Sequence, residues 1–218
     1  AIQKFLSGFA DEIKMVQPNF GLLLDKSIPF NENKLALLDQ LTECMQGNNA
    51  QMIMVANKIL TELKQDGDFW QYCDMILENS KSFNSKIFAL LALEEAINTR
   101  WKIFPEDQKE AIKKYMISLV IKLGSNPVND QIVRIFLNKA NSLLIAIVKN
   151  EWSNTWVTFI PEIVGSSQTN QNLCENNLNL LKYLSEEIFD YSKNKLTSDQ
   201  IKELKAKLTN EFGSIYEL

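Results

Sequence analysis

Apolar side chains recur every three or four residues along almost the whole chain, which is the period of an amphipathic α-helix. The last such stripe contains Ile201, Leu204, Leu208, Phe212 and Ile215. Only seven glycines and five prolines interrupt the 218 residues, too few for many short strands and turns. The pattern therefore predicts an all-α fold of about ten helices in short and long pairs.

The helices are expected to stack as repeats. Residues 35–45 and 52–63 predict two helices joined by a very short turn, an antiparallel hairpin. Trp70, Trp101 and Trp152 follow one another at intervals of 31 and 51 positions, on either side of the roughly 40–47 residues of HEAT and armadillo repeats. We expect a HEAT-repeat α-solenoid, in which antiparallel helix pairs stack into a right-handed superhelical arch. A globin-like or bundle packing is the alternative.

The two ends of the chain differ from the middle. Residues 1–30 predict an extra amphipathic helix followed by a linker, since residues 18–29 contain Gly21 and two prolines, and residues 31–218 contain the repeats. Near the other end, Thr197 and Gln200 form a capping-box pattern that opens the last helix. The apolar stripe of that helix has no mate after it in the sequence. We therefore expect a fragment truncated at its C-terminal end, whose missing mate would cover the stripe.

The amino-acid composition argues against catalysis and metal binding. The chain contains no histidine, the usual acid–base group near neutral pH and the commonest metal ligand. Cys44, Cys73 and Cys174 have no short spacing, so buried free thiols are expected and not a zinc site or a disulfide framework. No catalytic residue, metal or cofactor is predicted, and the chain is expected not to be an enzyme. A formal charge of −4 disfavours nucleic acid, and the apolar stretch 140–148 is well short of the roughly 20 residues that span a membrane.

Three segments resemble the amino-terminal region of exportin-1-type nuclear export receptors, which belong to the importin-β (karyopherin) superfamily. The first is NTRWKIFP at residues 98–105, followed by IKKY at 112–115. The second is KNEWSNTW at 149–156, followed by FI at 159–160 and IVG at 163–165. The third is LCENN at 173–177, running into LSEEIFD at 184–190. Their order and spacing fit the family from about Leu35 to Phe212, whereas residues 1–28 have no counterpart in the resemblance.

The resemblance implies a function. Receptors of this family are rings of HEAT repeats that bind Ran in its GTP state through the inner helices of their amino-terminal repeats. Ran hydrolyses the GTP, and the groove for the export signal lies further along the receptor than this fragment extends. Export cargo and nucleoporins would be partners of the full-length receptor, which shuttles between nucleus and cytoplasm through the nuclear pore. No direct contact with nucleic acid and no membrane insertion is expected.

If the second helix of each pair is the inner one, its solvent-facing residues are the candidates for contact with Ran. They are Met54, Asn57, Lys58, Thr61, Glu94, Asn98, Lys139, Asn141, Asn177 and Lys182. Each of the polar ones has an alternative role, because a polar side chain on an inner helix can instead hydrogen-bond to the adjacent repeat. Trp101, Trp152 and Trp156 are either exposed binding hot spots or packing between repeats, and the second reading is favoured.

Three other functions remain open from the sequence. The solenoid could belong to another transport receptor of the importin-β family, or to a cytosolic HEAT-repeat scaffold unrelated to transport. A helical enzyme with a site between helices is the third possibility. The absence of histidine, of a glycine-rich phosphate loop and of a metal-ligand pattern counts against it.

Overall fold

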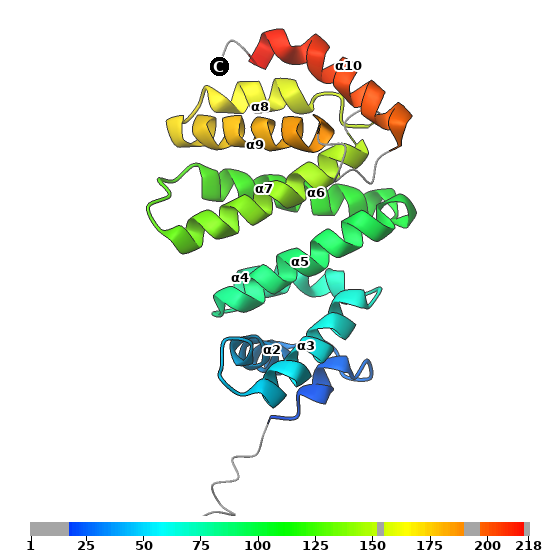
Figure 1. The fold of residues 1–218 in the computed structure, drawn as a ribbon, viewed down its shortest axis with the longest axis vertical. Coiled ribbons are helices and arrows are strands. Elements are labelled where there is room, and N and C mark those ends of the chain that lie inside the picture. Colours follow the sequence, from blue (N-terminus) through cyan, green and yellow to red (C-terminus); the bar gives the residue numbers. More distant parts are fainter. Residues whose placement is uncertain (1–17, 152–154, 190–196, 216–218) are drawn as a thin grey trace, which may run out of the picture. The chain divides into compact units, whose positions relative to one another are not determined.

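The computed structural model describes residues 18–151, 155–189 and 197–215, and all of the regular structure there is helical. The chain divides into two compact units, residues 1–88 and 89–218. The division falls inside one helix, α5 (Phe83–Arg100). The prediction of an all-α chain is therefore confirmed for the described residues (Figure 1).

The first unit is built around a helical hairpin, as predicted. Helices α2 (Glu32–Cys44) and α3 (Ala50–Gln65) pack together across a short turn. Each begins at an asparagine: the Asn31 side chain accepts a hydrogen bond from the Lys34 N–H, and the Asn49 side chain accepts from two N–H groups of α3. These caps satisfy amide groups that have no partner within a helix, so the two short segments start at defined residues.

The predicted linker is a packed segment, which corrects the expectation. A 3-10 helix, η1 (Phe20–Leu24), contacts both α2 and α3 and buries Phe20 and Leu23. The buried Lys34 ammonium of α2 donates hydrogen bonds to the carbonyl oxygens of Asp25 and Ile28, at 2.6 and 2.8 Å. Glycine and proline prevent a long regular helix here, but the apolar side chains between them still pack against α2 and α3. Residues 1–17, with the predicted extra helix, lie outside the described residues.

A polar interface joins α2 to the segment that leads into α5. After η2 (Phe69–Tyr72) and α4 (Cys73–Asn79), the Ser80 hydroxyl donates to the Asp39 carboxylate at 2.6 Å. The Ser82 hydroxyl likewise donates to the Glu43 carboxylate at 2.7 Å and accepts from the first turn of α5. Ser82 therefore caps α5, which begins at Phe83, and α2 holds the capping hydroxyl in place.

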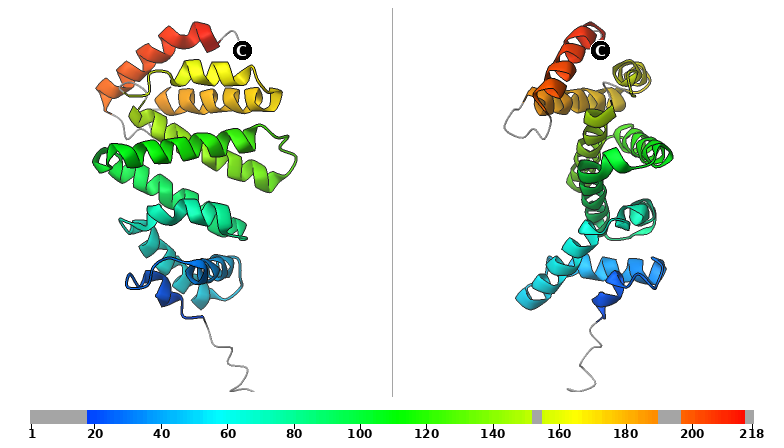
Figure 2. Two further views of the ribbon diagram at one scale, coloured as in Figure 1. Left: turned by 180° about the vertical axis from the view of Figure 1, so that it is seen from behind. Right: turned by 90° about the vertical axis from the view of Figure 1, so that its right-hand side faces the viewer.

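The second unit contains two antiparallel helix pairs, and a further helix packs on the second pair. Its elements are the remainder of α5, η3 (Trp101–Ile103), α6 (Glu106–Gly124), α7 (Gln131–Glu151), α8 (Phe159–Ser167), α9 (Gln171–Phe189) and α10 (Ser198–Ile215). The pairs are α6 with α7 and α8 with α9 (Figure 1). Helices α6 and α8 lie on one side of the unit and α7 and α9 on the other, as the side view in Figure 2 shows. This arrangement confirms stacked helix pairs within the unit.

Helix α7 is the core helix of the second unit. By length and composition it is also the one described helix that could cross a membrane, and half of its most apolar window is buried within the structure. Every residue from Ala140 to Val148 is buried except Ser142, against neighbouring helices that include α6 and α9. Packing on several sides at once accounts for its nearly continuous apolar sequence.

Helix α10 begins and packs in ways that the sequence predicts only in part. The capping box is confirmed: the Thr197 N–H donates to the Gln200 side chain at 3.0 Å, and the Gln200 N–H donates to the Thr197 hydroxyl at 3.3 Å. The stripe of Ile201, Leu204 and Leu208 is buried, and α10 packs on α8 and α9. The expectation that this part of the stripe needs a mate from outside the chain is therefore wrong, since the preceding pair already covers it.

Candidate protein-binding surface

In the first unit, the predicted residues of α3 share an exposed face. Met54, Asn57, Lys58 and Thr61 are all exposed, and Met54 keeps 73% of its surface. Residues three, four and seven positions apart lie on the same side of a helix, so these four form one strip. The opposite face packs Ala56, Ile59 and Leu63 into the unit. An exposed methionine is unusual among solvated charges and is well suited to an adaptable protein contact.

In the second unit, Glu94 and Lys139 join α5 to α7. The Lys139 ammonium lies 2.5 Å from the Glu94 carboxylate, and the two side chains keep 26% (Glu94) and 23% (Lys139) of their surface. This contact is the one that the alternative prediction describes, in which a polar side chain of an inner helix bonds to the adjacent repeat. Asn98, one turn beyond Glu94 on α5, is exposed.

A second ion pair, which the sequence analysis missed, joins α7 to α9. The Lys149 ammonium lies 2.8 Å from the Glu187 carboxylate. Lys149 is ten positions after Lys139, about 2.8 helical turns, so the two side chains leave α7 roughly 80° apart and reach different neighbouring helices. Both lysines stand out in the apolar sequence of α7, but the acids that they contact depend on which helices pack beside it.

Two predicted residues are buried and do not face solvent, which corrects the prediction. The Asn141 and Asn176 side-chain amides exchange hydrogen bonds of 2.8 and 3.3 Å between α7 and α9. The Asn177 amide group donates to the Ile163 carbonyl and to the hydroxyls of Ser166 and Ser167 in α8. Each buried amide is satisfied within the protein, so these residues tie repeats together. Lys182 is exposed, 3.8 Å from the Glu186 carboxylate.

The polar residues of α5, α7 and α9 enclose a groove of about 270 Å³, which we call the acidic groove. Its polar lining consists of Glu94, Asn98, Ser142, Lys149, Tyr183, Glu186 and Glu187. Three carboxylates and one ammonium group line it, and its two ion pairs hold the three helices together. Each of these carboxylates already has a lysine within 4.0 Å, so the groove offers a protein partner paired charges and hydrogen-bonding groups and not a net negative charge.

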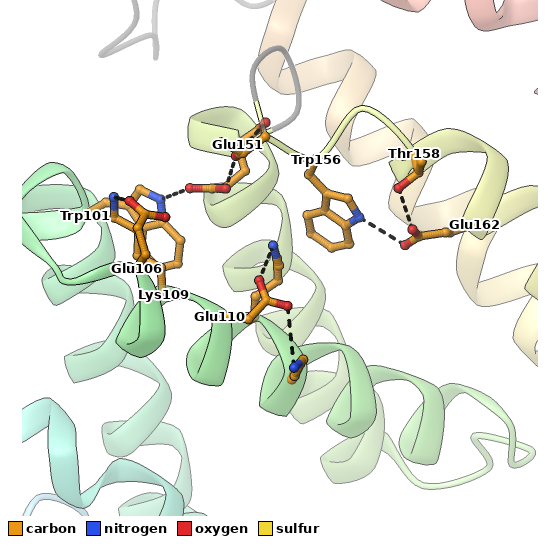
Figure 3. A network of polar contacts seen from close by, with 11 residues as sticks. Trp101, Glu106, Lys109, Glu110, Glu151, Trp156, Thr158 and Glu162 are labelled. Carbon is orange, nitrogen blue, oxygen red and sulfur yellow. Dashed lines mark hydrogen bonds and ion pairs between the residues drawn. The ribbon is translucent and has the colours of Figure 1, made fainter.

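The tryptophans form packing between helices, as the favoured reading predicts. The buried Trp101 donates its indole N–H to the Glu151 carboxylate at the end of α7, at 2.7 Å (Figure 3). The Thr155 hydroxyl also donates to that carboxylate. The buried Trp156 donates its indole N–H to Glu162 of α8 at 3.0 Å (Figure 3). Satisfied indole groups in buried positions fix structure and leave no free hot spot there. Trp152 lies outside the described residues.

Two kinds of side-chain chemistry bear on reactivity in the described residues, metal binding by clustered ligands and the buried Cys73 thiol. No group of three or more His, Cys, Asp or Glu residues is placed to hold a metal ion there. Burial raises the pKa of the Cys73 thiol far above its ordinary value, so this cysteine stays protonated and unreactive. The hydrogen bond from Lys113 lowers the pKa of Glu110, a surface carboxyl in an ion pair at 2.6 Å.

The helices described above match two known protein families in sequence. A family profile described as "Importin-beta N-terminal domain" matches residues 56–122, and one described as "Exportin 1-like protein" matches residues 133–218. The fold is thus that of the HEAT-repeat proteins of the importin-β superfamily. Exportin-1 of Drosophila melanogaster is 43% identical over 198 residues, which is 91% of this chain and 18% of the relative. Exportin-1 of Dictyostelium discoideum is 39% identical over 198 residues, which is 89% of this chain and 19% of the relative.

A plant relative extends the similarity to a third lineage. Protein EXPORTIN 1A of Arabidopsis thaliana is 40% identical over 163 residues, which is 75% of this chain and 15% of the relative. Within the importin-β superfamily, the chain belongs to the exportin-1 family. It spans less than a fifth of the length of these relatives. The predicted family resemblance is confirmed over most of the chain.

Proposed function

We propose that this chain is part of a nuclear export receptor and binds Ran in its GTP state. The match of residues 56–122 to an importin-β N-terminal domain is the observation that carries the proposal. That match ends in α6 and includes three of the four residues of the α3 strip, Asn57, Lys58 and Thr61. It also includes the Glu94 and Asn98 side chains of the acidic groove. Export cargo and nucleoporins would be bound by the longer receptor, which would move between nucleus and cytoplasm.

The contact with Ran would use side chains that the fold leaves available. On α3 these are Met54, Asn57, Lys58 and Thr61, which are exposed on one face. On α5 and α9 they are Asn98 and Lys182, together with the acidic side chains that line the acidic groove. Asn141 and Asn177 would act indirectly, because their amides hold α7, α8 and α9 in register. Ran would supply the GTPase chemistry, and the receptor would respond only to the state of its nucleotide.

The test is a titration of the 218-residue chain with Ran loaded with a non-hydrolysable GTP analogue, with GDP-loaded Ran in parallel. Binding selective for the GTP form is expected, with micromolar affinity. Equal binding of the two forms would contradict the proposal, because a contact outside the nucleotide-sensing regions cannot report the GTP state. The absence of binding at high micromolar Ran would contradict it for this chain.

Variants locate the contact. Met54→Glu with Lys58→Glu alters the α3 strip, and Asn98→Arg places a cation at the edge of the acidic groove. Each is expected to weaken Ran-GTP binding about tenfold or more, since a handful of interface side chains supplies most of the binding energy. Lys122→Glu is the matched control, a charge change at an exposed position of α6 on the other side of the second unit. Unchanged affinity in the first two variants would show that Ran binds elsewhere.

A further inference from the structure

A second groove lies beside the turn between α6 and α7, and its lining is rich in carboxamides. It has a volume of about 460 Å³, within the range of sites that bind small ligands or short peptide segments. Six asparagines line it, from the turn, from α7 and from α9: Asn126, Asn129, Asn138, Asn172, Asn176 and Asn179. We call it the carboxamide groove.

Some of these asparagines build the walls. The Asn126 amide donates to the Lys122 carbonyl at 2.8 Å, and the Asn172 amide donates to the Ser125 carbonyl at 3.4 Å, so the turn is fastened to both α6 and α9. Arg134 donates to the Val128 carbonyl at 3.2 Å on the α7 side. Asn176 is held by Asn141. A groove whose walls are already bonded loses little conformational entropy when a ligand enters.

Other asparagines are available. Asn138 of α7 and Asn179 of α9 are exposed in the groove, and neither amide has a hydrogen-bond partner among the described residues. Each carboxamide presents a donor and an acceptor together. Asn172, Asn176 and Asn179 recur at helical spacing, so they follow one side of α9 for about 10 Å at 1.5 Å per residue. That length corresponds to roughly three residues of extended polypeptide at ~3.3 Å each.

The lining decides which ligand class fits. Phosphate and nucleic acid need clustered cations, and the groove contains a single arginine opposed by one carboxylate, Glu175. Apolar small molecules need a mainly apolar lining, whereas this lining is mainly polar. A helical peptide satisfies its own backbone groups, so it gains nothing from free carboxamides. An extended peptide has one free N–H and one free C=O per residue, the pair that a carboxamide matches.

We propose that the carboxamide groove binds an extended, uncharged segment of a partner polypeptide through its backbone, with Asn138 and Asn179 as the contacting residues. The Tyr183 ring lies where this groove adjoins the acidic groove, since it lines both. The proposal does not depend on Ran binding, which uses other side chains. Both could occur on one molecule.

The test selects random linear peptides, displayed on phage, against the 218-residue chain, and then measures the affinity of the enriched synthetic peptides. Asn138→Ala with Asn179→Ala is expected to weaken binding about tenfold or more. The same peptides with methyl groups on their central backbone nitrogens are expected to lose binding by a similar factor, because their donors are gone. Asn33→Ala with Asn210→Ala, two exposed carboxamides on other helices, is the matched control and should leave affinity unchanged.

Loss of binding through a lost contact can be told apart from loss of binding through unfolding. Alanine raises helix propensity relative to asparagine, so the double variant should melt no lower than the parent chain and a loss of affinity would not reflect unfolding. Enriched peptides that tolerate both asparagine substitutions would overturn the proposal, as would peptides that tolerate backbone methylation. Failure to enrich any peptide would also overturn it.

Discussion

Trp101 and Glu151, fifty positions apart in sequence, are joined by a hydrogen bond of 2.7 Å from the indole N–H to the carboxylate. The ring is 4% exposed and the acid 6%, so the bond is made away from water. It fastens the segment between α5 and α6 to the end of α7, at the boundary between consecutive helix pairs (Figure 3). A buried carboxylate that accepts from Trp101 and Thr155 is stable there because two donors replace water.

Replacing Glu151 by alanine should destabilise the chain by about 1–3 kcal/mol, because the buried indole N–H is left without an acceptor. Trp101→Phe removes the donor and should cost a similar amount, part of it from lost packing. Urea unfolding, followed by circular dichroism, measures both. The control is Glu106→Ala, which breaks an exposed ion pair to Lys109 and should change stability by less than about 1 kcal/mol. Equal effects of Glu151→Ala and Glu106→Ala would contradict the role of the buried bond.

Two glycines provide a matched pair. A Cβ on Gly124 would lie 2.9 Å from the Asn176 amide nitrogen, and Asn176 cannot move without breaking its bonds to Asn141. Gly124→Ala should therefore cost about 1–3 kcal/mol, as overpacking does. A Cβ on Gly165 in α8 meets nothing within 4 Å, so Gly165→Ala should stabilise by up to about 1 kcal/mol through helix propensity. Thermal melting compares the two, and a stabilising Gly124→Ala would show that α6 and α9 can separate freely.

The ion pair of Glu94 and Lys139 predicts a charge-swap result. Lys139→Glu alone places two carboxylates in contact and should cost about 1 kcal/mol, a value limited by the quarter of each side chain that water still reaches. Adding Glu94→Lys restores an attractive pair and should return most of the stability. The free energy of unfolding in all four combinations gives the coupling energy.

The same swap separates stability from binding. The reversed pair presents the opposite charge at the same positions beside the acidic groove, so Ran-GTP binding should fall although the melting temperature is recovered. Full binding by the swapped variant would mean that Glu94 and Lys139 serve only to join α5 and α7.

Glu211 predicts a pH effect. Burial raises the pKa of this carboxyl from its ordinary value of 4.5, and Lys207 offsets this only in part. One carboxylate oxygen has no hydrogen-bond partner among the residues that the structure describes. A pKa that is higher in the folded state means that folding favours the protonated acid. The contribution of Glu211 is therefore most favourable below pH 4.5 and is lost as the pH rises through the folded-state pKa. Glu211→Gln should raise the melting temperature at neutral pH and leave it nearly unchanged in acid; a uniform shift at both would contradict this cause.

Local sequence patterns predicted the elements well. The Thr197 and Gln200 capping box forms as its side chains require, because a cap involves atoms only three residues apart. The burial of Trp101 and Trp156 also follows from their size, since a large apolar ring at a repeat boundary has more to gain from packing than from solvent. The segments at 98–105 and 149–156 identified the family because they combine several such residues in a fixed order.

Only the tertiary structure decided which polar residues of the paired helices are available to a partner. Asn138 and Asn141 lie one turn apart on α7, yet the first is exposed and the second is buried against Asn176. Helical spacing defines faces but not which face meets the neighbouring helix, and a polar group gains as much from an internal partner as from water. For the same reason Phe20 and Leu23 pack against α2 and α3 in a stretch that reads as a linker. The sequence by itself therefore determined the helices, the Thr197 capping box and the family, whereas the contacts between helices determined the surface left for binding.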